Sequence, residues 1–268
     1  MYLFFNTITK QDQECWKTIL SYLCKRRQNK VHNLMETIQL GIHHLPYDVV
    51  IDHTLLDKMV YSDMRKNYYW SEDFNASYYI AQAKAGFIAI TDYFEEDELL
   101  LPEMQFAYTL LDFQNLHISR KVQKLLQRKR VEIEIGTELD AVAQAIEMTH
   151  KNSWLTPRYL EMLKETEGKD ENFKVISITL KDEEKLVAGE IGYIIGRTYT
   201  SLSGFSLKEK PYNNYGTAQL VLLAQYLEKN GFAFWNLGQP YMAYKFALGA
   251  KVYERSVFLK RWFEATGQ

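Results

Sequence analysis

The chain has 268 residues, of which 47% are hydrophobic and 14% aromatic, and its formal net charge is −2. This composition supplies enough apolar surface for a packed core and excludes a mostly disordered chain. With a net charge near zero, affinity for nucleic acid would have to come from a local basic cluster.

Cysteine usage and hydropathy favour a soluble cytoplasmic protein. Cys15 and Cys24 have neither metal-ligand spacing nor the pattern of a disulfide framework. The opening MYLFF is too short for a signal-peptide core, and no apolar run is long enough to span a bilayer. The absence of such a run leads us to expect no membrane contact. His43 and His44 have no third ligand nearby, so we also expect no bound metal.

The first part of the chain is predicted to be mainly helical. Apolar residues recur at three- and four-residue steps over much of residues 10–60. A further helix is predicted over residues 75–85, with Asn75 or Ser77 as its cap and Gly86 at its end.

An acidic turn at residues 95–98 is the predicted domain boundary. It separates a helical N-terminal region (1–95) from a second domain (96–268). Directly after the turn, LLLPEM (99–104) and FAYTLLDF (106–113) are expected to be paired strands.

A basic amphipathic helix is predicted over residues 118–130. Its apolar stripe contains Val122 and Leu125. Six of the eleven residues at 120–130 are basic, namely Arg120, Lys121, Lys124, Arg128, Lys129 and Arg130. Such clusters supply phosphate contacts, although a solvated helix face is the alternative interpretation.

The next segment predicts two helices and then three strands. The helices span 138–151 and 157–166, and Thr156 before Pro157 is a good start for the second. Trp154, just ahead of it, is either a core anchor or a platform for stacking a base.

The three predicted strands cover residues 173–180, 185–195 and 197–204, with a tight turn at Gly196. On the last of them, Ser203, Phe205 and Ser206 are candidates for lining a donor pocket. The same residue types are also ordinary in any sheet.

The last hundred residues have a distinctive element order. Strands are followed by a turn, a long helix, the apolar strand FAFWNLG (232–238), a short helix and a final strand. This is the order of an N-acetyltransferase-type domain, in which the central strands splay and an activated acyl group lies in the gap beside an attacking amine. Gln239 closes the apolar strand at this point and is either a structural amide or a reacting-group positioner.

Together these segments resemble the leucyl/phenylalanyl-tRNA–protein transferase family. The resemblance rests on residues 116–130, SWLTP (153–157), 187–206 and FWNLGQ (234–239) with its spacing to ALGA (247–250), and it covers roughly 68–262. It implies an α+β fold with an N-acetyltransferase-like (GNAT), mixed, splayed sheet flanked by helices over 96–268.

The resemblance also implies a reaction and its site. A Leu-, Phe- or Met-like amino acid moves from tRNA to the N-terminal amine of a protein beginning with Arg or Lys, which marks that protein for degradation. Aminoacyl-tRNA is the co-substrate, and neither coenzyme A nor a metal is needed. Gln239 falls on the catalytic glutamine, with Asn236 as the nearest polar substitute for the missing acid. Phe205 and Ser206 fall on the donor-pocket motif, with Ser203 beside them on the same strand. The basic helix falls on the tRNA side, where Trp154 would help to hold the acceptor end and so bind the substrate.

Several positions depart from the family pattern. Pro102 and Glu103 stand where the family usually has a pair of tryptophans upstream of LHIS (116–119). Leu202 stands where the donor motif usually has a glutamate, and Leu237 stands where an aspartate usually precedes the glutamine. These departures keep open a non-catalytic tRNA- or degron-binding protein. NNYGTA (213–218) half-matches a pyrophosphate-binding motif, which keeps open a coenzyme-A-dependent N-acyltransferase.

Overall fold

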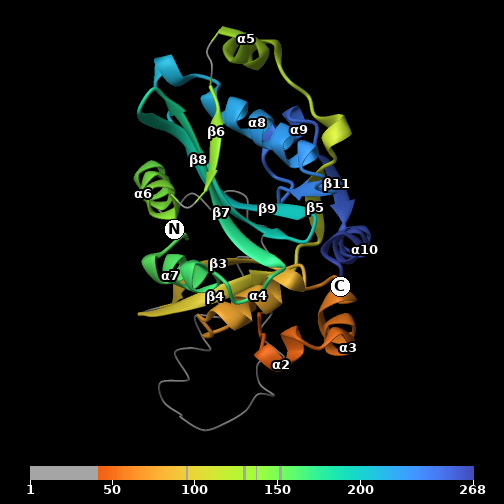
Figure 1. Cartoon of the computed structure of the whole chain (residues 1–268). Helices are drawn as coiled ribbons and strands as arrows, with labels where there is room; N and C mark the ends of the chain where they lie inside the picture. Colours follow the sequence, from red (N-terminus) through yellow and green to blue (C-terminus); the bar gives the residue numbers. More distant parts are fainter. Residues whose placement is uncertain (1–41, 95, 129–130, 137, 151–152) are drawn as a thin grey trace. The chain divides into compact units, whose positions relative to one another are not determined.

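The computed structural model describes residues 42–268 except 95, 129–130, 137 and 151–152 (Figure 1). The chain divides into two compact units, Met1–Phe106 and Ala107–Gln268. The division therefore follows Phe106 and does not fall in the acidic turn, because the chain pairs with itself across that turn. The helices expected over residues 10–41 and both cysteines lie outside the described residues.

The described part of the N-terminal unit is mixed and not mainly helical. Asn75 caps one of its helices as predicted, since its side chain accepts a hydrogen bond from the backbone N–H of Tyr78 at 2.9 Å. The helical elements are α2 (Tyr47–Val50), α3 (His53–Leu56), the π-helical turn η2 (Asp57–Tyr61) and α4 (Ala76–Lys84). The strands are β1 (His43–His44), β2 (Tyr69–Trp70), β3 (Ile88–Phe94) and β4 (Asp97–Glu103), of which β1 pairs with β2 and β3 with β4.

The predicted pairing of LLLPEM with FAYTLLDF is wrong. The first segment forms β4 and completes its ladder with β3, its neighbour across the acidic turn. The second forms β5 (Ala107–Leu111), which lies between two strands of the C-terminal unit. Local pattern identified both strands, but it could not identify their partners.

The C-terminal unit is built on a seven-stranded mixed sheet with the order β11-β5-β10-β9-β8-β7-β6. The three strands predicted over 173–204 are confirmed, with the turn at Gly196 at φ +52°. The strands beside β5 are β6 (Ile133–Gly136), β7 (Phe173–Asp182), β8 (Lys185–Ile195), β9 (Thr198–Ser206), β10 (Phe234–Asn236) and β11 (Lys251–Glu254).

Helices cover both faces of this sheet. Gln219 contacts Glu190, whereas Val142 lies over the adjacent Gly189, so the helices that carry them lie on opposite faces (Figure 1). These helices are α8 (Tyr215–Lys229) and α6 (Leu139–Thr149); the others are α5 (Arg120–Arg128), α7 (Pro157–Glu165), α9 (Ala243–Ala247) and α10 (Arg255–Thr266), with short 3₁₀ turns at Phe113–Asn115 and Lys210–Tyr212. The predicted α+β class, a large mixed sheet flanked by helices, is confirmed. None of the described helices is long and apolar enough to cross a lipid bilayer.

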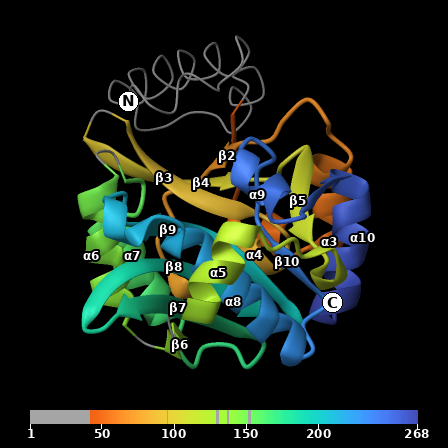
Figure 2. The same ribbon diagram turned by 90° about the horizontal axis from the view of Figure 1, so that it is seen from above.

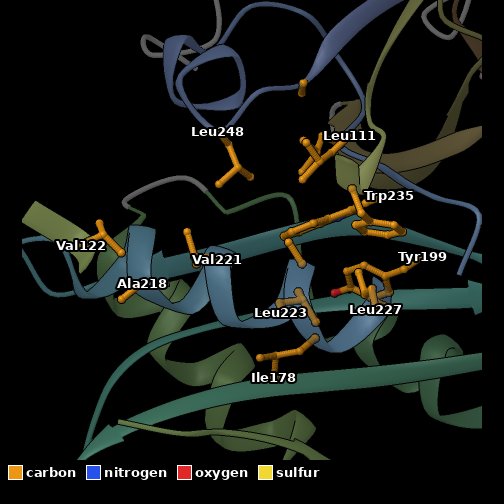
Figure 3. Packing of buried hydrophobic residues seen from close by; sticks show 14 of the residues in the cluster. Leu111, Val122, Ile178, Tyr199, Ala218, Val221, Leu223, Leu227, Trp235 and Leu248 are labelled. Atoms are coloured by element: carbon orange, nitrogen blue, oxygen red, sulfur yellow. The ribbon is translucent and has the colours of Figure 1, made fainter. Parts of the chain in front are cut away.

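One apolar core joins the sheet to three of these helices. Trp235 of β10 and Tyr199 of β9 are fully buried under α8, with their ring centroids 5.7 Å apart (Figure 3). Leu248, directly after α9, and Val122 of α5 belong to the same cluster. Burial of each such side chain contributes about 1.5–3 kcal/mol, so α5, α8 and α9 are fixed to one another by packing.

Candidate active site

The sheet splays where β9 and β10 part. The two strands pair in parallel only over Thr198–Thr200 and Phe234–Asn236. Beyond Asn236 the chain follows β5 instead, since Leu237 N–H donates to the Thr109 carbonyl at 2.9 Å and Thr109 N–H donates to the Gly238 carbonyl at 2.7 Å. Among the described residues, β9 therefore has a strand partner only on its β8 side from Ser201 onward, and we call this place the strand divergence.

Gln239 lies on a rigid turn at the strand divergence. Gly238 has φ +71°, a left-handed conformation that favours glycine. The ammonium group of Lys245, which is only 5% exposed, donates to the backbone carbonyls of Leu237 at 2.5 Å and of Gln239 at 2.7 Å. A charged donor shared by two carbonyls fixes the path of this turn, and Gln239 itself is half-buried.

Asn236 supports the turn and does not face a substrate. It is 1% exposed, its Oδ1 accepts from Gly238 N–H at 3.0 Å, and its Nδ2 donates to Thr200 Oγ1 at 3.4 Å. Because both ends of its amide are engaged inside the protein, we replace the catalytic role predicted for Asn236 with a supporting one.

Beside the divergence, β8 carries a buried carboxylate. Glu190 is 4% exposed, and its Oε1 accepts from the Tyr199 hydroxyl at 2.8 Å and the Ser201 hydroxyl at 2.9 Å. Its Oε2 accepts from Gln219 Nε2 at 3.1 Å, and Ser201 Oγ in turn accepts from Trp235 Nε1 at 2.8 Å. Burial raises the pKa of Glu190, although hydrogen bonds from Tyr199, Gln219 and Ser201 oppose the rise.

The negative charge of Glu190 also influences Tyr244 of α9. Although Tyr244 is 45% exposed, burial raises the pKa of its hydroxyl group, and the negative charge of Glu190 raises it further. The carboxylate on β8 and the helix that follows the Gln239 turn thus belong to one electrostatic environment.

The residues predicted to line the donor pocket do not all lie on the same face of the sheet. The pairing register shifts so that Ser203 lies opposite Ile191 and Ser201 opposite Gly192, which makes the intervening Leu202 a bulge. Phe205 is 7% exposed and packs against Gly189 on the α6 face of the sheet.

Ser206 lies on the opposite face, under the first turn of α8. A methyl group on Gly216 would come within 2.7 Å of Ser206 Cβ. This close approach explains the glycine of NNYGTA by helix–strand packing, without a phosphate ligand.

Trp154 is half-buried and rests edge-on against Tyr159, with ring centroids 5.1 Å apart. Thr156 caps α7 as predicted, its side chain accepting from Tyr159 N–H at 3.2 Å. Nearby, His150 Nε2 lies 2.9 Å from the Gly204 carbonyl on β9. The segment that leads to Trp154 therefore contacts β9 beyond the strand divergence.

The basic helix presents its charges to solvent. Figure 2 shows α5 lying over α8, and Val122 is the buried residue of α5 in the shared apolar cluster. The basic side chains of the helix are all exposed, namely Arg120, Lys121, Lys124 and Arg128. In the described part of the chain these four side chains make no ion pair. Lys129 and Arg130 lie outside the described residues.

The segment before α5 is tied to the end of α9. His117 N–H donates to the Leu248 carbonyl at 2.9 Å, and His117 Nδ1 lies 3.0 Å from the Ala247 carbonyl. Gly249, at φ +103°, lies directly against the Asn115 carbonyl. The basic helix is thus connected through α9 to the Gln239 turn.

This C-terminal unit is also the part that matches known proteins. A sequence model described as leucyl/phenylalanyl-tRNA protein transferase matches residues 110–262, more than half of the chain. The chain belongs to this transferase family. A curated relative, the leucyl/phenylalanyl-tRNA–protein transferase of Pseudomonas fluorescens (strain Pf0-1), is 27% identical over 169 residues, which cover 62% of this chain and 71% of the relative.

Solved structures similar to this transferase are more distant. They include the C-terminal domain of a putative lysylphosphatidylglycerol synthetase from Agrobacterium fabrum (14% identity, 70% of this chain, 60% of that chain, TM-score 0.40). They also include FemX (11% identity, 55% and 59%, TM-score 0.43) and L-PGS from Bacillus licheniformis (13% identity, 65% and 51%, TM-score 0.38). The transferase spans less than two thirds of each of these structures.

Sequence reasoning missed most of the polar groups around the divergence of this transferase. One signal was available: Glu190 is a lone charge inside the apolar run 187–195. The other missed groups, Tyr199, Ser201, Gln219, Tyr244 and Lys245, are ordinary residues in helix and strand patterns, and only the fold brings them together.

Proposed function

We propose that this transferase moves an amino acid from tRNA to the N-terminal α-amine of a protein, typically one beginning with Arg or Lys, and so marks that protein for degradation. Family membership supports transfer from aminoacyl-tRNA to protein. The observation that carries the proposal is the Gln239 turn, held by Lys245 and Asn236 where β10 leaves β9.

The proposed chemistry needs neither coenzyme A nor a metal. The neutral amine attacks the ester carbonyl, a C–N bond forms, the C–O bond breaks, and the tRNA hydroxyl leaves with a proton from the amine. An α-amine with a pKa of about 8 is already partly neutral at pH 7. An amide is a poor base, so Gln239 serves by orienting the ester or the amine, and such positioning supplies up to about 7–11 kcal/mol.

Mass measurement of peptides incubated with charged tRNAs tests this function. Wild-type enzyme is expected to add one residue to peptides that begin with Arg or Lys. Gln239→Ala is expected to lower kcat about 100-fold, because a misplaced group costs about that much, while tRNA affinity stays unchanged. Binding of acetyl-coenzyme A in calorimetry, without tRNA binding, would instead support a coenzyme-A-dependent enzyme, and binding of tRNA without transfer would support a non-catalytic protein.

Exchange of the exposed charges on α5 tests the tRNA-binding surface. Changing Lys121, Lys124 and Arg128 to Gln is expected to reduce the slope of log K against log salt by about 2–3, since each lost phosphate contact contributes about 0.7–0.9. Filter binding of tRNA over a salt series measures this slope.

A charge-matched control is the change of the exposed Lys174, Lys229 and Lys260 to Gln. An equal loss of slope in both triple variants would mean that the overall charge, and not α5, governs binding.

A further inference from the structure

The carboxylate of Glu190 is buried without a cation. All three of its hydrogen-bond donors, Tyr199, Ser201 and Gln219, are neutral. Across the described residues no lysine, arginine or histidine pairs with it. Desolvation of a carboxylate without a partner is costly, which is why burial raises the pKa of Glu190, and a cationic partner would offset this cost.

Glu190 is next to the place where the donor is expected. Ser201, which donates to Glu190, is the first residue of β9 without a β10 partner. Tyr244, whose pKa responds to the charge of Glu190, is exposed and follows the Gln239 turn on α9. Through its bond to Ser201, the buried carboxylate is therefore linked to the point where β9 and β10 part.

The carboxylate of Glu190 accepts fewer hydrogen bonds than it has acceptor positions. A carboxylate has about four lone-pair positions. Two donors share Oε1, while Gln219 alone occupies Oε2, so Oε2 retains one acceptor position. A ligand ammonium or guanidinium group would fill that position and supply the missing positive charge.

Resting on the proposed function, we propose that the transferred amino acid has a cationic side chain, and that Glu190, held by Ser201 and Gln219, recognises it. An apolar side chain here would lie against a charge, an amide and hydroxyl groups and would leave the charge unpaired, which disfavours Leu, Phe and Met as donors.

The departure at Leu202 agrees with this proposal. The family usually has a glutamate at this position, and here Leu202 is a half-buried bulge on β9. A negative charge is retained one strand away, on β8, and is bonded to Ser201, the residue before Leu202. In this chain the carboxylate beside the divergence is therefore supplied by β8 and not by β9.

Competition between charged tRNAs tests the proposal. The wild-type enzyme is expected to transfer Lys or Arg at least tenfold faster than Leu, Phe or Met in equimolar mixtures. Glu190→Gln keeps the volume and an acceptor for Tyr199 and Ser201, and it is expected to reduce this preference tenfold or more. The double variant Glu190→Met with Gln219→Leu is expected to gain transfer of Leu, Phe or Met, a result that misfolding cannot produce.

The matched control is Glu228→Gln, which removes an exposed carboxylate from α8 and is expected to leave the donor preference unchanged. A wild-type preference for apolar donors, or an equal fall for all donors in Glu190→Gln, would overturn the proposal. If no donor amino acid is transferred at all, the proposed function is wrong, but this result does not test the role of Glu190. Filter binding of lysyl-tRNA and leucyl-tRNA then decides the inference: a Glu190-dependent preference for lysyl-tRNA supports it, and equal affinities overturn it.

Discussion

Replacing Gly249 with alanine is expected to lower the free energy of unfolding of the C-terminal unit by about 3–5 kcal/mol. The backbone of Gly249 is at φ +103°, which an L side chain rarely adopts, and the new Cβ would lie 1.9 Å from the Asn115 carbonyl oxygen. Neither group can give way locally, because the adjacent Leu248 and His117 are hydrogen-bonded to each other. Chemical denaturation followed by circular dichroism measures the loss.

Gly231→Ala separates backbone strain from the clash. Gly231 has a similar left-handed conformation, at φ +78°, but nothing lies within 4 Å of its added Cβ. It is expected to cost only about 1–2 kcal/mol. Equal losses in the two variants would show that the contact between Gly249 and Asn115 contributes nothing to stability.

This contact also explains why ALGA (247–250) accompanies the Gln239 segment in the sequence. The motif holds no reacting group. It lets α9 end directly against the chain that leads into α5, so that the basic helix and the Gln239 turn keep a fixed separation. We therefore expect Gly249→Ala to weaken tRNA binding as well as stability.

Local patterns in the sequence predicted the elements of the C-terminal unit well. Alternating apolar residues identified β7 to β9, and Thr156 before Pro157 located the start of α7, because caps and strand periodicity depend only on neighbouring residues. The position of Gln239 at the end of an apolar strand was also correctly predicted. These features require no knowledge of tertiary contacts.

The polar lining of the candidate site could not be predicted in the same way. The pairing keeps Ser203 and Phe205 on one face, as strand alternation predicts, but Ser206 lies on the opposite face and the bulge at Leu202 turns Ser201 away from Ser203. A bulge depends on the register between two strands, which a single sequence does not specify. Glu190 became a candidate only when that register brought Ser201 beside it.

Lys245 is the largest omission, because a lysine in a short polar-looking helix is normally solvent-exposed. Here its ammonium group is buried and joins the carbonyls of Leu237 and Gln239. Without it, two carbonyl groups would be left without a charged donor at the point where the chain turns away from β9. We therefore infer that Lys245 is a positioning residue that acts through the backbone of Gln239.

Lys245→Met preserves the length of the side chain and removes the ammonium group. It is expected to destabilise the unit by about 2–4 kcal/mol, because the carbonyls of Leu237 and Gln239 lose a charged donor, and hydrogen bonds to charged groups contribute about 1.5–3 kcal/mol. It is also expected to lower kcat about 100-fold through displacement of Gln239, while tRNA affinity, which we propose to depend on α5, stays near wild type. Hydrogen exchange in residues 237–242 should rise while exchange in β7 and β8 stays slow.

Lys260→Met is the matched control, since Lys260 is exposed on α10 and its loss should change none of these quantities. The split between kcat and tRNA affinity distinguishes positioning from general instability, because partial unfolding would lower both together. If Lys245→Met retained wild-type kcat despite faster exchange at 237–242, the backbone of the turn would not control Gln239. Contacts of the Gln239 side chain itself would then have to hold its amide in place.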